Sequence, residues 1–178
     1  MRHDVFLRGG FTYSFIDTLD YLVGGRGSFG VIGFLTPKWS MGGEFGASYL
    51  GSEIVTDPTS LNVAPYTFYD NTNTYIISAY DIAGVFLYQL SNRVEARSRL
   101  GFEIEAIENK AVSYTLAADN ITILKETATA STTNVGLLLG FGFNFNLIRS
   151  LFLTVDYTYV NIDNINTFQI GLEYRLNA

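Results

Sequence analysis

The stretch that decides the fold is RVEARSRLGFEIEA, residues 93–106. Its ionised side chains stand at odd positions, whereas the side chains at even positions are apolar apart from one serine. Because a β-strand directs successive side chains to opposite faces, this segment is predicted to be a strand with one charged and one apolar face. Neighbouring segments repeat the pattern, so we expect the charges to lie inside a closed barrel and the apolar side chains to face hydrocarbon.

The bulk composition favours a β-protein. Hydrophobic residues make up 48% of the 178 residues. The longest uncharged run, residues 127–148, contains Asn134, Asn144 and Asn146, and its apolar residues alternate rather than cluster. It therefore fails the requirement of about 20 predominantly apolar residues for a membrane-spanning helix. A soluble β-protein or a membrane β-barrel remains, and the length suits a single domain over residues 1–178.

Eight segments carry strand-like patterns, and each is long enough to cross a bilayer at a tilt. The predicted strands comprise residues 5–15, 26–35, 39–50, 75–90, 93–106, 134–147, 151–160 and 168–176. Connections after the second, fourth and sixth strands are tight, and the other connections are longer or polar. Residues 51–74 and 107–133 are predicted to be long loops. This alternation is expected of an even-stranded barrel with both termini on one side.

The inward positions of these strands carry seven acids and six bases. A narrow eight-stranded barrel has room only for packed side chains, and buried charges must be paired, so this near balance is what such an interior requires. The predicted ion-pair network of the lumen comprises Arg8, Arg26, Glu44, Asp81, Arg93, Glu95, Arg97, Arg99, Glu103, Glu105, Asp156, Glu173 and Arg175.

The outward positions are predicted to contact lipid, with aromatic residues near the strand ends at the two membrane interfaces. The lipid-facing residues are Phe11, Val31, Phe45, Phe86, Phe102, Leu139, Phe141, Phe143, Val155, Ile170 and Leu172. The interfacial aromatic residues are Tyr13, Trp39, Tyr49, Tyr88, Phe145, Tyr159 and Tyr174.

The competing interpretation is a soluble, lipocalin-like barrel with an apolar interior that holds a greasy ligand. In that barrel, Phe141, Phe143 and Phe145 would line the cavity, and a row of glycines and asparagines would face water. We favour the membrane barrel on this ground.

The C-terminal hairpin carries a family resemblance. The sequences GLLLGFGFNFNLIRSLFLTVDYTYV (residues 136–160) and TFQIGLEYRL (residues 167–176) resemble the small outer-membrane β-barrels of Gram-negative bacteria. This porin-like family includes the OmpA transmembrane domain. The resemblance implies an all-β, antiparallel, up-and-down transmembrane barrel with short periplasmic turns and longer extracellular loops. It also implies contact with lipid and lipopolysaccharide, and recognition of the last strand by the insertion machinery. Leu176 stands where that family usually has Phe.

Residues typical of other functions are few. The sequence has no cysteine, and its single histidine, His3, has no partner set, so we predict no enzyme activity, cofactor or metal site. Residues 70–73 and 161–164 offer oxygen ligands at calcium-like spacing, but ordinary turn chemistry explains them. A net charge of −6 without a basic cluster argues against nucleic acid. The N-terminus lacks the apolar core of a signal peptide, so we expect an exported chain from which that peptide has been removed.

The predicted function is therefore structural: anchoring in the outer membrane, or adhesin-like binding of an extracellular partner through residues 51–74 and 107–133. The alternative is a narrow, porin-like pore for ions or small solutes. Fold resemblance does not decide between them, because function depends on the site.

Overall fold

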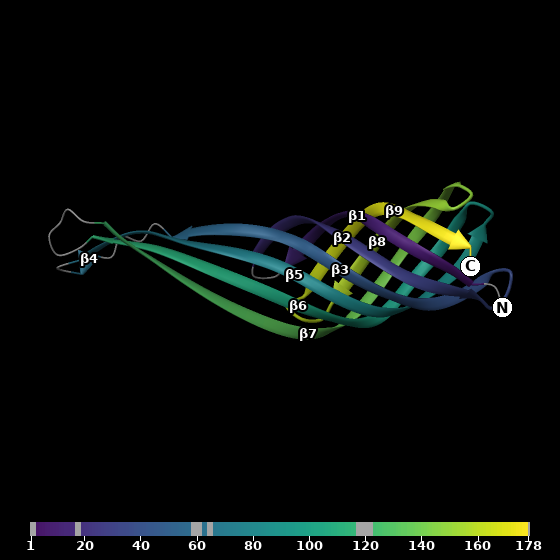
Figure 1. Ribbon diagram of the computed structural model, residues 1–178, viewed down its shortest axis with the longest axis horizontal. Coiled ribbons are helices and arrows are strands. Elements are labelled where there is room, and N and C mark those ends of the chain that lie inside the picture. The colour runs from purple at the N-terminus through teal and green to yellow at the C-terminus, as the bar shows by residue number, and fades with distance from the viewer. Residues whose placement is uncertain (1–2, 17–18, 58–61, 64–65, 117–122, 178) are drawn as a thin grey trace. The chain divides into compact units, whose positions relative to one another are not determined.

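The computed structural model describes residues 3–16, 19–57, 62–63, 66–116 and 123–177, and these residues form an all-β protein (Figure 1). No helix among them is long and apolar enough to cross a membrane. The strands are β1 (His3–Ile16), β2 (Leu19–Phe34), β3 (Trp39–Asp57), β4 (Asn62–Val63), β5 (Tyr66–Ser91), β6 (Val94–Leu116), β7 (Ile123–Ile148), β8 (Leu151–Val160) and β9 (Ile165–Asn177).

The strands form a ring. Their order is β3-β2-β1-β9-β8-β7-β6-β5-β4, and an additional pairing of β3 with β5 closes the sheet on itself. β4 has only two residues and pairs with β5 in a small hairpin, so eight strands make the ring. The predicted eight-stranded antiparallel barrel is confirmed.

The ladders keep residues of one parity on one face. In the ladder between β1 and β9, Arg8 pairs with Glu173, and in the ladder between β1 and β2 it pairs with Ser28. All three side chains are buried, whereas their chain neighbours, such as Leu7 and Phe29, are exposed. A slip by one residue would exchange the two faces, so the alternation of polar and apolar residues fixes the register.

The turns that follow β2, β5 and β7 lie at the same end of the barrel as the start of β1 and the end of β9 (Figure 1). Asp4 pairs with Asn177 in the ladder between β1 and β9, so the two terminal strands run side by side. Backbone hydrogen bonds tie the turns to neighbouring strands: Gln89 donates to the Lys38 carbonyl and Asn146 to the Arg93 carbonyl, both at 2.8 Å.

The predicted loops are the part of the fold that was wrong. Residues 51–74 include the end of β3, all of β4 and the start of β5, and residues 107–133 include the end of β6 and the start of β7. Residues 58–61, 64–65 and 117–122 lie outside the described residues. The error has a physical cause: alternation of apolar and polar residues marks strands with one apolar face, whereas threonine-rich strands with two polar faces still form ladders. β2 likewise begins at Leu19, inside the connection predicted over residues 16–25.

The chain divides into two compact units. The barrel unit comprises Met1–Gly51, Ser78–Glu105 and Asn134–Ala178, and the polar unit comprises Ser52–Ile77 and Ala106–Thr133. Four strands, β3, β5, β6 and β7, contribute residues to both units.

Candidate functional site

The interior of the barrel unit holds a network of ion pairs, and Arg26 of β2 lies in its middle. The Arg26 Nη2 atom lies 2.8 Å from Glu44 Oε1 and 2.8 Å from Asp81 Oδ1. Arg99 of β6 reaches the same aspartate, with Nη2 3.1 Å from Asp81 Oδ1. Four strands thus meet through side chains that are almost fully buried.

Arg97 carries the network across the interior. Its Nη1 lies 2.7 Å from Glu173 Oε2 of β9, and its Nη2 forms an ion pair with Glu44 of β3. The guanidinium also lies over the Phe6 ring, 5.2 Å from its centroid. Arg97 is only 1% exposed, so its charge is compensated within the barrel and not by water.

Two more arginines complete the network. The Arg175 Nε lies 2.7 Å from Glu173 Oε1, and its Nη1 donates to Glu95 Oε1 at 3.0 Å. Arg8 forms an ion pair with Asp156 and donates through Nε to Thr154 Oγ1 at 3.2 Å. Each buried guanidinium therefore has at least one carboxylate against it.

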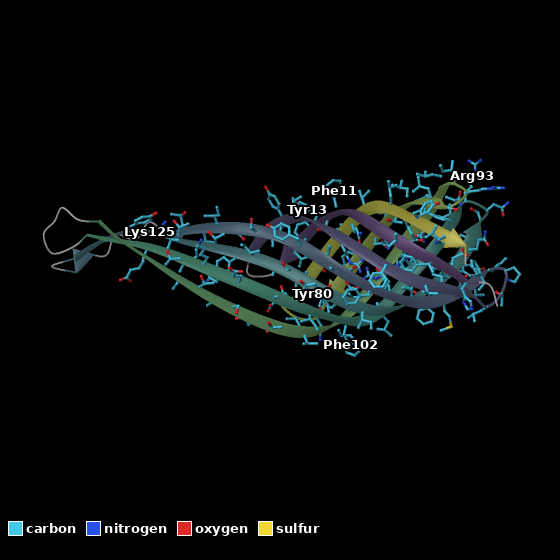
Figure 2. The ribbon with its side chains drawn as sticks, viewed as in Figure 1. Phe11, Tyr13, Tyr80, Arg93, Phe102 and Lys125 are labelled. Atoms are coloured by element: carbon cyan, nitrogen blue, oxygen red, sulfur yellow. The ribbon has the colours of Figure 1, made fainter. Side chains whose placement is uncertain are left out.

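Three residues of the predicted network stand apart from it. Arg93 lies in the turn between β5 and β6 and is exposed, so it is not in the lumen (Figure 2). Parity alone placed it inward, because parity does not show where a strand ends. Glu103 and Glu105 are buried, but within the described residues neither forms an ion pair with an arginine or lysine. Without Arg93, the predicted residues that do face inward are seven acids and five bases, and five of the seven acids form ion pairs.

Apolar side chains close the interior toward both ends of the barrel unit. A buried cluster of Phe6, Ile32, Val85 and Leu87 lies toward the short-turn end. Toward the opposite end, the buried apolar residues are Ile16, Leu22, Leu50, Leu138, Val160 and Ile165. The predicted lumen residues include neither group, although every member except Leu138 shares the parity of the inward charges on its own strand.

One cavity within the described interior is very small. A cavity between the charged network and the second apolar group has a volume of about 10 Å³, and Thr12, Arg26, Glu103 and Gln169 are among its lining residues. That volume holds about one water molecule. A polar recess of about 380 Å³ lies at the short-turn end, lined by Glu95, Arg175 and residues of the turns.

Comparison with known proteins identifies this architecture. The family model described as an outer membrane protein beta-barrel domain matches residues 4–175. The chain belongs to the outer membrane protein β-barrel family. No curated protein matches the sequence.

Solved structures show the same fold for this outer-membrane barrel at low sequence identity. The attachment invasion locus protein Ail of Yersinia pestis is 15% identical with a TM-score of 0.58, covering 99% of this chain and 100% of Ail. The N-terminal β-barrel domain of Pseudomonas aeruginosa OprF is 11% identical with a TM-score of 0.55, covering 99% and 100%. OprG from the same bacterium is 13% identical with a TM-score of 0.51, covering 98% and 96%. Membership of this family places the protein in the bacterial outer membrane.

The outer face of this outer-membrane barrel is apolar, as hydrocarbon requires. Phe11 is 80% exposed, and Figure 2 shows Phe11 and Phe102 directed away from the barrel. The other exposed members of the predicted lipid-facing set are Val31, Phe45, Phe86, Leu139, Phe141, Val155, Ile170 and Leu172. Phe143 is half-buried, because its ring lies between those of Phe141 and Phe145 at centroid distances of 5.2 and 6.4 Å.

Aromatic pairs lie near the strand ends of the outer-membrane barrel. The Trp39 and Tyr88 rings are 4.6 Å apart next to the short turns, and Tyr13 stacks on Tyr21 at 5.4 Å. Tyr49, Phe145 and Tyr174 are exposed, whereas Tyr88 and Tyr159 are half-buried. Their role as interfacial girdles stays a prediction.

The described residues contain no group of three or more histidine, cysteine, aspartate or glutamate side chains placed to hold a metal ion. His3, the only histidine, is exposed at the start of β1 and pairs with Gly33 in the ladder.

Proposed function

We propose that this outer-membrane barrel is a closed anchor that presents an exposed strand edge to an extracellular polypeptide, with residues 1–178 acting as one domain. The observation that carries the proposal is strand β7. Every residue from Lys125 to Thr133 is exposed, on both faces of the strand. Among the residues that the structure describes, β7 pairs only with β6 in this part, because its ladder with β8 runs from Leu138 to Ile148.

The free edge of β7 lacks the usual protection against pairing. Natural edge strands are blunted by charges, proline or bulges. Residues 127–133, TATASTT, contain neither charge nor proline. On the other side of the polar unit, the pairing of β2 with β3 ends at Tyr49, so residues 52–57 of β3 form a second edge. That edge carries two acids, Glu53 and Asp57. The β7 edge is therefore the one that accepts a further strand.

The chemistry of the edge indicates the class of partner. An unpaired strand edge offers alternating backbone N–H and C=O groups, which bind an extended peptide by adding it to the sheet. The side chains of this segment are small, with hydroxyls on one face and alanines on much of the other. They leave room for bulky side chains on the partner strand. Recognition would then depend mainly on the backbone of the partner.

A sulfated polysaccharide is a less suitable partner. One structure of Ail is a complex with the heparin analogue sucrose octasulfate. The polar unit of the present protein carries six acids and two lysines in its sequence, a net charge of −4, which repels sulfate groups.

The edge proposal is tested with a fluorescein-labelled peptide of alternating threonine and valine, added to the refolded full chain. We expect binding that weakens about a hundredfold when alternate backbone nitrogens of the peptide are methylated, because three lost hydrogen bonds cost about 1 kcal/mol each. Fluorescence anisotropy measures both peptides. Equal affinity for the two peptides, which have the same side chains, would contradict pairing through the backbone.

A pair of neighbouring variants locates the binding edge. Successive residues of a strand direct their N–H groups to opposite sides, so only one of Ala128→Pro and Thr129→Pro removes a donor from the free edge. That variant should lose peptide binding while β7 keeps its hydrogen bonds to β6. If both variants still bind the peptide, the peptide does not bind at the free edge of β7.

We further propose that the lumen does not conduct, which supports anchoring over the porin-like alternative. Three features of the described interior support a closed lumen: the buried ion pairs, the two buried apolar groups and the small size, about 10 Å³, of the cavity between them. The expected result in planar lipid bilayers is an unchanged baseline current after insertion of the protein. Steady unitary currents from the unmodified chain would contradict a closed lumen.

We propose the remaining partners from the outward face. Phe168, Ile170, Leu172, Tyr174 and Leu176 of β9 are all exposed and would contact lipid and lipopolysaccharide chains. The same alternating aromatic strand is the segment that we propose the outer-membrane insertion machinery recognises.

A further inference from the structure

The small cavity of the barrel unit is surrounded by polar atoms that lack hydrogen-bond partners. Within the described residues, no partner is found for Arg26 Nη1, Arg99 Nη1, Thr12 Oγ1 or Gln169 Nε2. All four residues line this cavity, whose volume is about 10 Å³, and each is at most 8% exposed. Because buried polar groups are normally hydrogen-bonded, four such groups around a single cavity indicate that the cavity binds a ligand.

The fold brings these four residues together from four strands. Thr12 of β1 lies directly opposite Gln169 in the ladder between β1 and β9. Arg26 of β2 and Arg99 of β6 are held by the same acid, with their Nη2 atoms 2.8 and 3.1 Å from Asp81 Oδ1. Since these ion pairs fix both guanidinium groups through Nη2, the Nη1 atoms remain available to a ligand.

A carboxylate lines the same cavity. Glu103 of β6 is 6% exposed, and within the described residues it forms no ion pair with an arginine or lysine. One buried acid and two guanidinium groups therefore share a small space without a direct ion pair between them. A ligand that accepts hydrogen bonds from the arginines and donates one to the glutamate would connect all three.

The charges around the cavity argue against an ion as this ligand. A cation would lie against two guanidinium groups, which have donors and no acceptor. An anion would lie against Glu103, in an interior where the acids of the predicted network already outnumber the arginines. A water molecule both donates and accepts, makes about three hydrogen bonds when buried, and fits a cavity of this size.

We propose that one water molecule is bound in this cavity, where it accepts hydrogen bonds from Arg26 and Arg99 and donates one to Glu103. Its second hydrogen can be donated to Thr12 Oγ1, which lacks a partner within the described residues. The bound water gives Glu103 the contact with positive charge that no direct ion pair supplies. It also joins β1, β2 and β6 across the interior, next to the ion pairs of the network.

The experiment uses the full chain refolded into lipid nanodiscs, with ¹³C-labelled methyl groups. A bound water molecule gives a nuclear Overhauser effect between the water resonance and the methyl groups beside it. We expect this signal at Val160, which lines the cavity. Val85 is the matched reference, because it is an equally buried valine in the apolar cluster with Phe6, and it should give no signal. Absence of the signal at Val160 would overturn the proposal.

Two variants of Thr12 test the position of the water. Thr12→Val keeps the shape of the side chain and removes the hydroxyl, so the signal at Val160 should persist through the three other partners. Thr12→Ile also adds a methyl group in the cavity and should abolish the signal. Its Tm should be at least about 3 °C below that of Thr12→Val, because the displaced water leaves buried charged groups without a partner.

Three results would contradict a bound water. A signal that persists in both Thr12 variants would come from exchanging hydroxyl protons of other residues. A Tm of Thr12→Ile equal to or above that of Thr12→Val would show a dry cavity, which an added methyl group fills with a gain in stability. Solvent ¹⁷O relaxation, which hydroxyl protons do not affect, decides the matter even if Thr12→Ile does not fold. It should detect a long-lived water in the unmodified protein, and its failure to do so would overturn the proposal.

Discussion

Replacing Arg97 with methionine is expected to lower the free energy of unfolding by about 3–5 kcal/mol. Methionine keeps much of the side-chain volume but removes the charge that lies against Glu44 and Glu173. Both carboxylates would remain buried with less compensation than they have now. Urea unfolding in lipid vesicles, followed by the fluorescence of the single tryptophan, Trp39, measures the difference.

Arg93→Met is the matched control for this variant. Arg93 is the same residue type, four positions earlier, but it is exposed in a turn. Its replacement should change the free energy of unfolding by no more than about 0.5 kcal/mol. Adding Glu44→Gln and Glu173→Gln to Arg97→Met should restore part of the lost stability, because the two charges without Arg97 are then removed as well. Equal effects of Arg97→Met and Arg93→Met would contradict a network that depends on Arg97.

Phe11→Arg is expected to destabilise the barrel by about 2–4 kcal/mol, the cost of a lipid-facing arginine near the middle of a bilayer. Phe11 lies well inside β1, opposite Ile170 and Gly25, and is the most exposed of the large apolar side chains that the structure describes. Because the Phe11 ring makes few contacts within the protein, the change in stability reports whether the side chain is surrounded by lipid or by water. The folded fraction in vesicles is read from the difference in gel mobility between unheated and boiled samples.

Thr129→Arg provides the comparison for Phe11→Arg. Thr129 is exposed in the polar unit, where we propose that the surroundings are water. It should leave the folded fraction unchanged. In a soluble barrel Phe11→Arg would also be nearly neutral, since an exposed arginine is well solvated. A neutral result for Phe11→Arg would therefore remove the support for a lipid-facing outer surface.

Parity along the chain predicted the faces of the strands but not their ends. Arg8 and Glu173 were assigned inward from their neighbours alone, and the structure pairs them across a ladder. Arg93 has the same parity and yet lies in a turn, because alternation does not mark where hydrogen bonding stops. Residues 125–133 show the converse: they form a strand without any apolar face, so the signal that revealed the barrel is missing there.

The ion-pair partners within the lumen could not be predicted from the sequence, for a different reason. Arg97 and Glu173 are 76 residues apart, and Arg175 and Glu95 are 80 apart. Which acid meets which base depends on strand order and register together. The apolar group with Phe6 and Ile32 was not predicted, because only charged residues were assigned to the lumen. Both could have been assigned inward from Arg8 and Arg26.

The ladder between β1 and β9 has a consequence for how the protein is made. It joins the first and last strands of the barrel, so closure of the barrel depends on contacts between residues far apart in sequence, and such contacts form slowly. Before β9 is present, the sheet has two unpaired edges, and its outward apolar side chains have no bilayer around them. We therefore expect the barrel to close only after β9 has been synthesised.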